Sequence, residues 1–271
     1  MEQREDSLCL VTAFMDIGRG EWQTFTRSVK EYIASFMPYL NLNHDLIVFI
    51  DQTYSSSLQW ILEKDPPVAN VKIIPIDREW MNTNIRAYSK LEMEGKIMES
   101  QNYNGIIGHR KHCPECSHPE YNIMQHAKID FVCYAIENEL SKASHFAWTD
   151  FGYFKSSAML NPKGTNKLDL GRFDLDRINF QTINPIEDRD QQTMYTLQCA
   201  PEKIGGFFYL GSRDLLLSYQ KLYHQVNDEF HRMGLVDDDQ HFMIKCYFRR
   251  KDMFKLWDLN GWHKIYTTFC V

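Results

Sequence analysis

An aspartate at the end of a strand is the first candidate for chemistry in this sequence. Asp150 lies in the stretch AWTDFGYF, residues 147–154, directly after the partly apolar segment HFAW. A carboxylate that emerges there can give Mg²⁺ or Mn²⁺ an oxygen ligand, and such an ion can neutralise a leaving diphosphate. Gly152 stands where an Asp-x-Asp motif would carry its second acid. A plain turn at the strand end is the alternative interpretation of Asp150.

A run of acids around residue 238 is the second candidate. Asp237, Asp238 and Asp239 precede Gln240 at the start of VDDDQHFMIKCYFRR, residues 236–250. Acids in the first turn and arginines in the last turn suit the helix dipole, so this segment is predicted to be a helix. Capping needs only one of the acids. Another could accept the proton of a hydroxyl group, or orient that hydroxyl, which is general-base chemistry.

A glycine pair interrupts the apolar strand KIGGFFYLG, residues 203–211. Glycine within a strand often marks the close approach of a ligand or of another backbone segment. A sugar ring could pack against Gly205 and Gly206, and a simple bulge is the alternative. A complete Asp-x-Asp occurs at Asp174 and Asp176, but no apolar strand precedes it and a surface turn is the favoured interpretation.

Basic and cysteine-rich positions add further candidates. Lys128 lies within the apolar stripe of a predicted helix over residues 121–140, where it faces a phosphate or a base, or extends its stem along the surface. His263 could complete a metal shell, although an ordinary strand or turn explains it equally well. Cys113 and Cys116 have C-x-x-C spacing among histidines, but a zinc site needs four ligands and no second ligand pair follows at a distance.

Alternating strands and helices must position these residues. Apolar runs predict strands at residues 7–14, 45–51 and 70–77, with helices over 21–37 and from the Ser55–Ser57 region to 64. This order is typical of a parallel sheet with right-handed crossovers, whose ligands bind beyond the carboxyl ends of the strands. Later segments add helices over about 84–100 and 212–233, an irregular stretch at 102–122, and strands near 145–154, 177–183 and 203–211.

Composition narrows the classes of function. The chain has 271 residues, a net charge of -6 and 44% hydrophobic residues, so it can bury a sizeable core as a single α/β domain over residues 1–271. The acidic balance argues against a nucleic-acid binder. The acidic start does not resemble a signal or transit peptide, and no apolar run approaches the roughly 18 residues that span a bilayer. A soluble, cytoplasmic protein is expected, with contact at a membrane surface allowed and its cysteines reduced.

Taken together, several motifs resemble those of a known family. VTAFMDIGRGEW, PEYNIMQHAKIDFV, FAWTDFGYF and IGGFFYLG followed by DDDQHFM resemble the HtrL/YibB family over nearly the whole chain. Members of that family occur among bacterial lipopolysaccharide and capsule gene clusters and are thought to be glycosyltransferase-like. The order of parts is also similar to that of GT-A glycosyltransferases. The resemblance implies a GT-A-like α/β fold, with a mixed, mainly parallel sheet flanked by helices.

The resemblance also implies roles for individual residues. The nucleotide-binding half would span about 7–155 and the acceptor half about 156–271. Asp150 would be the first acid of the metal motif, with His263 as a late ligand to Mn²⁺ or Mg²⁺. Asp238 and Asp239 would act as base or sugar anchor. The remaining positions for the nucleotide, the sugar or the acceptor would be Phe14, Asp16, Arg19, Lys128, Gly205, Gly206 and Gln240.

The expected activity is transfer of a sugar from a nucleotide sugar, a UDP sugar foremost, to a saccharide acceptor in lipopolysaccharide, surface polysaccharide or glycan synthesis. Two alternatives remain open from the sequence. The first is a non-catalytic protein that binds a nucleotide sugar or a glycan on the same fold, which the missing second acid at Gly152 motivates. The second is an interaction module organised by zinc around Cys113 and Cys116.

Overall fold

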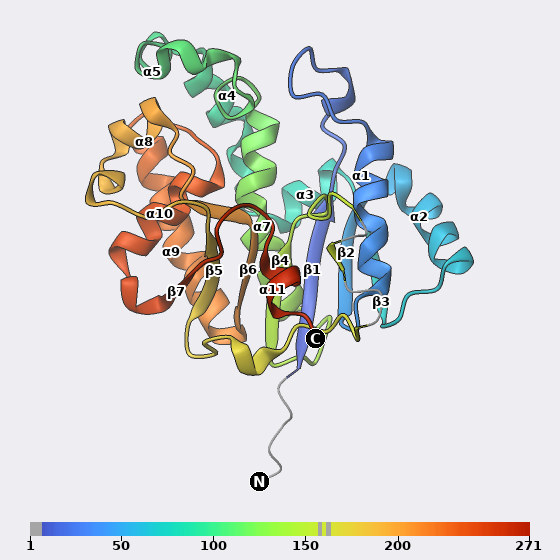
Figure 1. The fold of residues 1–271 in the computed structure, drawn as a ribbon. Coiled ribbons are helices and arrows are strands. Elements are labelled where there is room, and N and C mark those ends of the chain that lie inside the picture. The colour runs from blue at the N-terminus through green and yellow to red at the C-terminus, as the bar shows by residue number, and fades with distance from the viewer. Residues whose placement is uncertain (1–6, 157–158, 161–163) are drawn as a thin grey trace.

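The computed structural model of the chain describes residues 7–156, 159–160 and 164–271. Residues 1–6 of the predicted domain therefore lie outside the described residues. Seven strands form one sheet in the order β3-β2-β1-β4-β6-β5-β7, as Figure 1 shows. The strands are β1 Leu8–Phe14, β2 Asp45–Asp51, β3 Val71–Ile76, β4 His145–Thr149, β5 Ile178–Thr182, β6 Ile204–Ser212 and β7 Phe254–Asp258.

Strand direction places the carboxyl ends of β1 and β4 and the amino end of β6 at one edge of the sheet. β1 pairs in parallel with β2 and with β4, and β5 pairs in parallel with β7. β6 runs antiparallel to both of its neighbours, β4 and β5. The carboxyl ends of β1 and β4 therefore meet the amino end of β6, where the glycine pair lies. The predicted fold class, a mixed and mainly parallel sheet flanked by helices, is confirmed.

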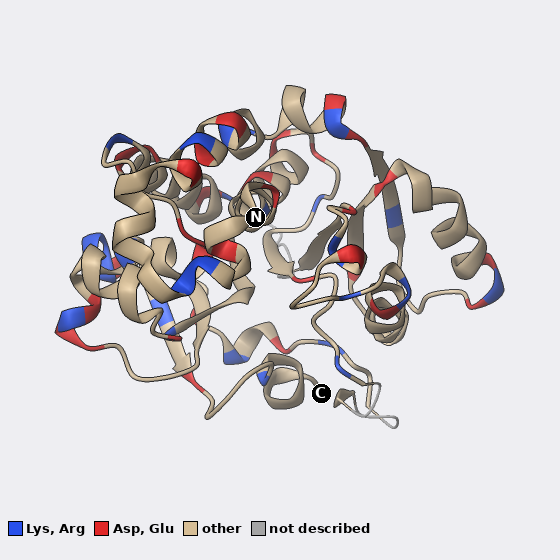
Figure 2. Ribbon diagram, turned by 90° about the horizontal axis from the view of Figure 1, so that it is seen from above, with Lys and Arg blue, Asp and Glu red and all other residues tan. Residues whose placement is uncertain are grey.

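Helices cover both faces of the sheet (Figures 1 and 2). The longer helices are α1 Val29–Phe36, α2 Gln52–Lys64, α4 Leu91–Glu99, α7 Pro119–Glu137, α9 Arg213–Arg232 and α10 Asp239–Arg249. The shorter helices are α3 Arg78–Asn84, α5 Gln101–Ile107, α6 Pro114–Ser117, α8 Thr193–Cys199 and α11 Ile265–Phe269. One-turn 3-10 helices connect several of these elements, among them η1 Arg19–Glu21 and η3 Ala87–Lys90.

The two faces carry separate cores because side chains alternate along each strand. In β1, Cys9 and Val11 join the core beneath α7, α9 and α10, while Leu8 and Leu10 join the core beneath α1, α2 and α11. Apolar contacts from both faces hold the sheet in place. The site at its edge is thereby built on rigid elements.

Several predicted boundaries were wrong. The helix predicted over residues 21–37 begins only at Val29, because Ser28 and Glu31 form a capping box there. The serines at 55–57 lie inside α2, which Asp51 caps through the backbone N–H of Thr53. The helix predicted over 84–100 is divided among the end of α3, η3 and α4, and the stretch predicted as irregular contains α5 and α6.

Candidate active site

A cavity of about 180 Å³ lies at the edge where β1, β4 and β6 meet. We call it the first cavity. Phe14 ends β1, Asp150 follows β4, and Lys128 reaches in from α7. The residues lining it are Ala13, Phe14, Met15, Asp16, Ile17, Arg19, Arg27, Val29, Tyr32, Tyr121, Met124, Gln125, Lys128, Trp148, Asp150, Phe151, Gly152, Lys155 and His263. It is the position at which ligands of open α/β sheets bind.

Asp150 is held firmly at the mouth of β4. Its Oδ1 accepts a hydrogen bond from Trp148 Nε1 at 2.8 Å and lies 3.1 Å from Lys128 Nζ. Its backbone N–H donates to the carbonyl of Phe207 at 3.0 Å, and its own carbonyl accepts from the Tyr39 hydroxyl at 2.7 Å. The side chain is still 35% exposed. Asp150 thus presents a fixed carboxylate to the first cavity at the end of β4.

Lys128 joins Asp150 to the acidic turn, which consists of Asp237, Asp238 and Asp239 at the start of α10. Its Nζ lies 2.8 Å from Asp239 Oδ2 and donates to the carbonyl of Gly206 at 3.0 Å, while the residue is only 5% exposed. Burial acts to lower the pKa of this ammonium group, but the carboxylates of Asp150 and Asp239 outweigh it and raise the pKa. Lys128 is therefore charged, and it points inward to tie β4, β6 and α10 together.

Gly206 explains why Asp239 can approach the sheet so closely. A Cβ atom at this position would collide with the Asp239 carboxylate. Gly205 has a different role, since a Cβ atom there would collide with the ring of Phe207. The predicted close approach at the glycine pair is thus made by the protein's own side chains. Gly206 belongs to the site through Lys128 and Asp239, whereas Gly205 supports the packing of Phe207.

The space beside Gly152, where a side chain would lie, is filled by Arg27. A Cβ atom at this position would collide with the guanidinium group of Arg27. Arg27 precedes α1 and is held by a hydrogen bond to the Ser35 hydroxyl at 2.7 Å and by stacking over the Tyr32 ring at 4.1 Å. The place where a second acid would stand beside Asp150 therefore holds a positive charge.

Three cations that have no acidic partner within the described ranges line the first cavity: Arg19, Arg27 and Lys155. Arg19 donates to the carbonyl of Phe25 at 2.8 Å and to the Tyr32 hydroxyl at 3.1 Å, and Lys155 donates to the carbonyl of Gly152 at 3.2 Å. Among the described residues, neither of these side chains nor Arg27 has a carboxylate within 4 Å. Burial and the positive charge of Arg27 lower the pKa of Lys155. The first cavity thus gathers positive charge in a chain whose net charge is -6.

An aromatic wall closes the other side of the first cavity. The Phe14 ring lies 4.9 Å from that of Tyr32 and 5.2 Å from that of Phe151. Asp16 lies beside this wall, and its carboxylate accepts from the Tyr54 hydroxyl at 2.8 Å and from the backbone N–H of Gly18 at 2.9 Å. Flat apolar surface next to a fixed carboxylate suits a nucleoside base and ribose.

The acidic turn lines a second cavity of about 200 Å³. Asp238, Gln240 and His241 form one side of it, and Arg19 and Tyr121 line both cavities. Asp238 caps α10 by accepting from the backbone N–H of Gln240 at 3.1 Å. Burial, followed by the charge of Asp237, raises the pKa of the Asp238 carboxyl well above its usual range. A half-buried carboxyl with a raised pKa is suited to accept a proton.

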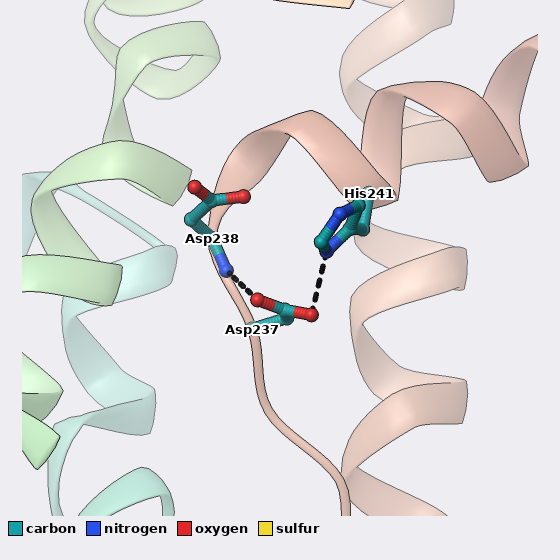
Figure 3. Close-up of side chains that lie close together, drawn as sticks. All are labelled: Asp237, Asp238 and His241. Carbon is teal, nitrogen blue, oxygen red and sulfur yellow. Dashed lines mark hydrogen bonds and ion pairs between the residues drawn. The ribbon is translucent and has the colours of Figure 1, made fainter. Parts of the chain in front are cut away.

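Behind Asp238 lies a set of paired charges, which we call the closed network: Arg110, Glu115, Asp237 and His241. Figure 3 shows Asp237 between Asp238 and His241. Asp237 Oδ2 lies 2.6 Å from His241 Nδ1. Arg110 lies 2.7 Å from Glu115 and 3.5 Å from Asp237. Burial acts to lower the pKa of His241, but Asp237 outweighs it and raises the pKa. Each charge in this network therefore has a partner of opposite sign.

His263 lines the first cavity from the C-terminal turn. Its ring stacks on Phe207 with centroids 4.4 Å apart and lies edge-on to Tyr153 at 4.9 Å. Burial and the charge of Lys155 lower its pKa to about 4. The imidazole is therefore neutral at physiological pH, which fits a hydrogen-bonding or packing role in the wall of the first cavity.

The predicted metal ligands do not assemble into a metal centre. Asp150 already faces the ammonium group of Lys128, and Arg27 takes the place of a second acid. Within the described ranges, the one group of three potential ligand side chains is Asp237, Asp238 and His241. That group is charge-balanced by Arg110 and joined by the 2.6 Å hydrogen bond between Asp237 and His241. Asp150 and His263 share the first cavity without forming the ligand set that Mn²⁺ or Mg²⁺ would need.

The other metal motifs lie elsewhere. Cys113 Sγ is 3.8 Å from His112 Nε2, while Cys116 is buried and its burial raises its thiol pKa to about 12. Neither cysteine belongs to a group of three potential ligands in the part of the chain that is described. Asp174 pairs with Arg177 at 3.7 Å before β5, at the edge of the sheet opposite the first cavity.

Most predicted site residues are brought together. Phe14, Asp16, Arg19, Lys128, Asp150 and His263 line the first cavity, and Asp239 and Gly206 contact Lys128. Asp238 and Gln240 face the second cavity. Sequence reasoning missed the cavity residues Arg27, Tyr32, Tyr121, Trp148 and Lys155. Lys155 and Trp148 stood within five residues of Asp150, but Arg27 carried no signal because it was placed inside the predicted helix 21–37.

The fold is a mixed, mainly parallel α/β sheet flanked by helices, with its cavities at the predicted edge of the sheet. The chain belongs to the HtrL/YibB family, described as "Bacterial protein of unknown function", whose model matches residues 6–271. It is 27% identical over 265 residues to Protein HtrL of Escherichia coli (strain K12), covering 93% of this chain and 88% of that protein. It also aligns with mouse xyloside xylosyltransferase 1 in its apo form, with a TM-score of 0.43 and 10% identity over 93% of this chain and 85% of that chain. No helix within the described residues is long and apolar enough to cross a membrane.

Proposed function

We propose that the protein is a glycosyltransferase that moves a sugar from a nucleoside diphosphate sugar to a saccharide acceptor. The observation that carries this proposal is the first cavity, where cations with no carboxylate partner among the described residues line the same space as the fixed carboxylate of Asp150. A diphosphate needs several positive groups, and the cavity offers Arg19, Arg27 and Lys155, which have no acidic partner in the part of the chain that the structure describes. The neighbouring aromatic wall of Phe14 and Tyr32 would take the base.

The donor and the acceptor would occupy adjoining cavities. The nucleotide sugar would bind in the half of the chain that spans about 7–155, with its sugar directed toward Lys128, Asp150 and Asp239. The acceptor would enter the second cavity, beside Asp238 and Gln240. Arg19 and Tyr121 line both cavities, so the reacting sugar would sit between them. The acceptor would be a saccharide of the kind used in lipopolysaccharide, surface polysaccharide or glycan synthesis, as the sequence resemblance implies.

The acidic residues would divide the chemistry between them. In transfer, the bond from the anomeric carbon to the diphosphate breaks, and a bond to the acceptor oxygen forms. The acceptor hydroxyl loses its proton, and Asp238 is placed to receive it because its carboxyl faces the second cavity and has a raised pKa. Asp239 is buried and paired with Lys128, so it would position that lysine. Asp150 would orient the donor sugar.

Incubation of the purified protein with UDP, GDP and ADP sugars, with and without saccharide acceptors, tests the proposal. We expect release of a nucleoside diphosphate from at least one donor, and a large loss of that release in Asp150→Ala with the fold retained. Circular dichroism and a melting curve check the fold. A folded protein that neither binds nor turns over any donor would contradict the proposal. Binding of a donor without turnover would favour a non-catalytic binding protein.

A further inference from the structure

We propose that this site neutralises the diphosphate of its donor with the side chains of Arg27, Arg19 and Lys155 instead of a divalent metal ion. This inference deepens the proposed function and rests on it. It concerns the region beside Asp150 where the sequence predicted Mn²⁺ or Mg²⁺. The residues there do not fit a metal centre, and their arrangement shows which groups take over its electrostatic role.

The exchange of an acid for a cation is visible at Gly152. Any side chain at this position would overlap the guanidinium group of Arg27. The absence of a side chain at 152 therefore makes room for Arg27, which the Ser35 hydroxyl and the Tyr32 ring hold in place. A guanidinium group can donate two parallel hydrogen bonds to phosphate oxygens. The guanidinium group of Arg27 thus fills the space beside Gly152 where a second acid would bind a metal ion.

The charges nearby support the same assignment. Lys128 lies against Asp150 and Asp239 together, so the carboxylate of Asp150 is already partly neutralised within the protein. A metal ion at Asp150 would have to bind beside this ammonium group and beside Arg27. Two close cations repel an incoming cation and attract an anion, and this effect is strong in a partly buried site.

The cations also repel one another while no anion lies between them. Burial and the charges of Arg27 and Arg19 lower the pKa of the Lys155 ammonium group, with only Asp150 acting in the opposite direction. A diphosphate bound between these groups would relieve the repulsion and raise that pKa again. Such an arrangement disfavours the empty site and favours binding of a polyanion.

Calorimetric titration of the whole chain with UDP, GDP and ADP, first in EDTA and then in Mn²⁺, tests the inference. We expect at least one nucleoside diphosphate to bind in EDTA with an affinity that Mn²⁺ changes less than about threefold, which is about 0.7 kcal/mol. Arg27→Ala and Lys155→Ala should each weaken that binding by about tenfold to a hundredfold, since each removes a charge-assisted contact. Arg27→Lys should retain part of the affinity.

A matched control and a reconstructed motif complete the test. Arg250→Ala removes an exposed arginine that pairs with Asp252 and does not line the first cavity, so it should leave the affinity unchanged. The double variant Arg27→Ala with Gly152→Asp restores the acid spacing and removes the obstructing cation. We expect its nucleoside diphosphate binding to require Mn²⁺. Lys155→Ala removes a side chain that donates a hydrogen bond to the Gly152 carbonyl, so it remains informative if Arg27→Ala fails to fold.

Three results would overturn the inference, and they differ in what else they affect. If a nucleoside diphosphate binds only when Mn²⁺ is present, the cationic side chains do not replace the metal, while the proposed glycosyltransferase function survives. If no nucleoside diphosphate binds with or without Mn²⁺, the proposed function fails as well. Binding in EDTA that Arg27→Ala and Lys155→Ala leave unchanged also contradicts the assignment.

Discussion

The first cavity and the closed network differ in whether their charged side chains have partners of opposite charge. In the closed network, Asp237 pairs with His241 and Arg110, and Arg110 also pairs with Glu115. In the first cavity, Arg27 and Lys155 have only neutral partners among the described residues. A buried charge that loses its partner is strongly destabilising, so the ion pairs of the closed network are needed for stability. Cations left unpaired beside a cavity are available to a ligand.

The boundary between these regions runs through the acidic turn. Asp237 faces into the closed network, Asp238 faces the second cavity, and Asp239 reaches Lys128 at the first cavity. Consecutive residues at a helix start point in different directions, which lets one short run serve three environments. Substitutions at these positions should therefore produce separate effects on stability, on transfer and on local packing.

The largest effect is expected from Asp238→Asn. The amide oxygen can still accept from the backbone N–H of Gln240, so α10 keeps its cap, but the side chain can no longer take a proton. We expect the rate of transfer at saturating donor to fall by about 10²–10⁴-fold, with donor affinity unchanged. Asp214→Asn, in the exposed first turn of α9, is the matched control. Full activity in Asp238→Asn would remove Asp238 as the base.

Asp237→Ala should mainly affect stability. It leaves His241 and Arg110 buried without their shared carboxylate, so we expect the free energy of unfolding to fall by about 3–5 kcal/mol. Urea denaturation measures this loss. Asp252→Ala removes an exposed acid that pairs with Arg250, and it should cost less than about 1 kcal/mol. Equal losses in the two variants would show that the closed network carries no special stability.

Gly206→Ala should disturb the junction between the two regions. The added methyl group collides with the Asp239 carboxylate, so either Asp239 or β6 must shift. We expect a loss of about 1–3 kcal/mol in unfolding free energy, typical of overpacking a tight site. Gly105→Ala in α5 meets nothing within 4 Å and should be neutral or stabilise by up to about 1 kcal/mol. A fully stable Gly206→Ala protein would mean that Asp239 is not constrained by the strand.

A smaller and graded effect is expected from pH. Burial and Asp237 raise the pKa of Asp238, so the basic form needed for transfer is lost as pH falls through this raised value. As pH falls below this raised pKa, the rate of transfer should decrease about tenfold per pH unit. The decrease should begin at a pH well above 4, where an ordinary aspartate titrates. Asp238→Asn should abolish this limb of the pH profile. Asp238 also makes stability depend on pH, because its pKa is higher in the folded protein than in the unfolded chain. The free energy of unfolding should therefore decrease as pH rises from the pKa of the unfolded chain to that of the folded protein.

The sequence predicted the edge of the sheet better than its surroundings. Asp150 and Phe14 could be placed because the carboxyl ends of neighbouring parallel strands lie at one edge of the sheet. The arrangement of Lys128 with Asp150 and Asp239 needed the three-dimensional structure, since these residues come from α7, from the end of β4 and from α10. The sequence suggested each as a candidate separately, but not their contact.

Arg27 shows why the charge of the cavity could not be predicted. Apolar residues at Trp22, Phe25 and Val29 have helical spacing, yet the chain is a loop up to Ser28. Trp22 instead stacks on His118 with centroids 3.9 Å apart, and Phe25 is half exposed. Periodicity therefore assigned Arg27 to a helix surface. The loop instead directs it to the space beside Gly152.

If Arg19, Arg27 and Lys155 hold a diphosphate in the first cavity, the second phosphate group must add affinity, and paired titrations measure that gain. UDP, GDP and ADP are compared with their monophosphates by calorimetry under identical buffer and salt. We predict that the diphosphate of the preferred base binds at least tenfold more tightly than its monophosphate, and that Lys155→Ala reduces this ratio. Equal affinities for the two nucleotides, or a ratio that Lys155→Ala and Arg27→Ala leave unchanged, would contradict the claim.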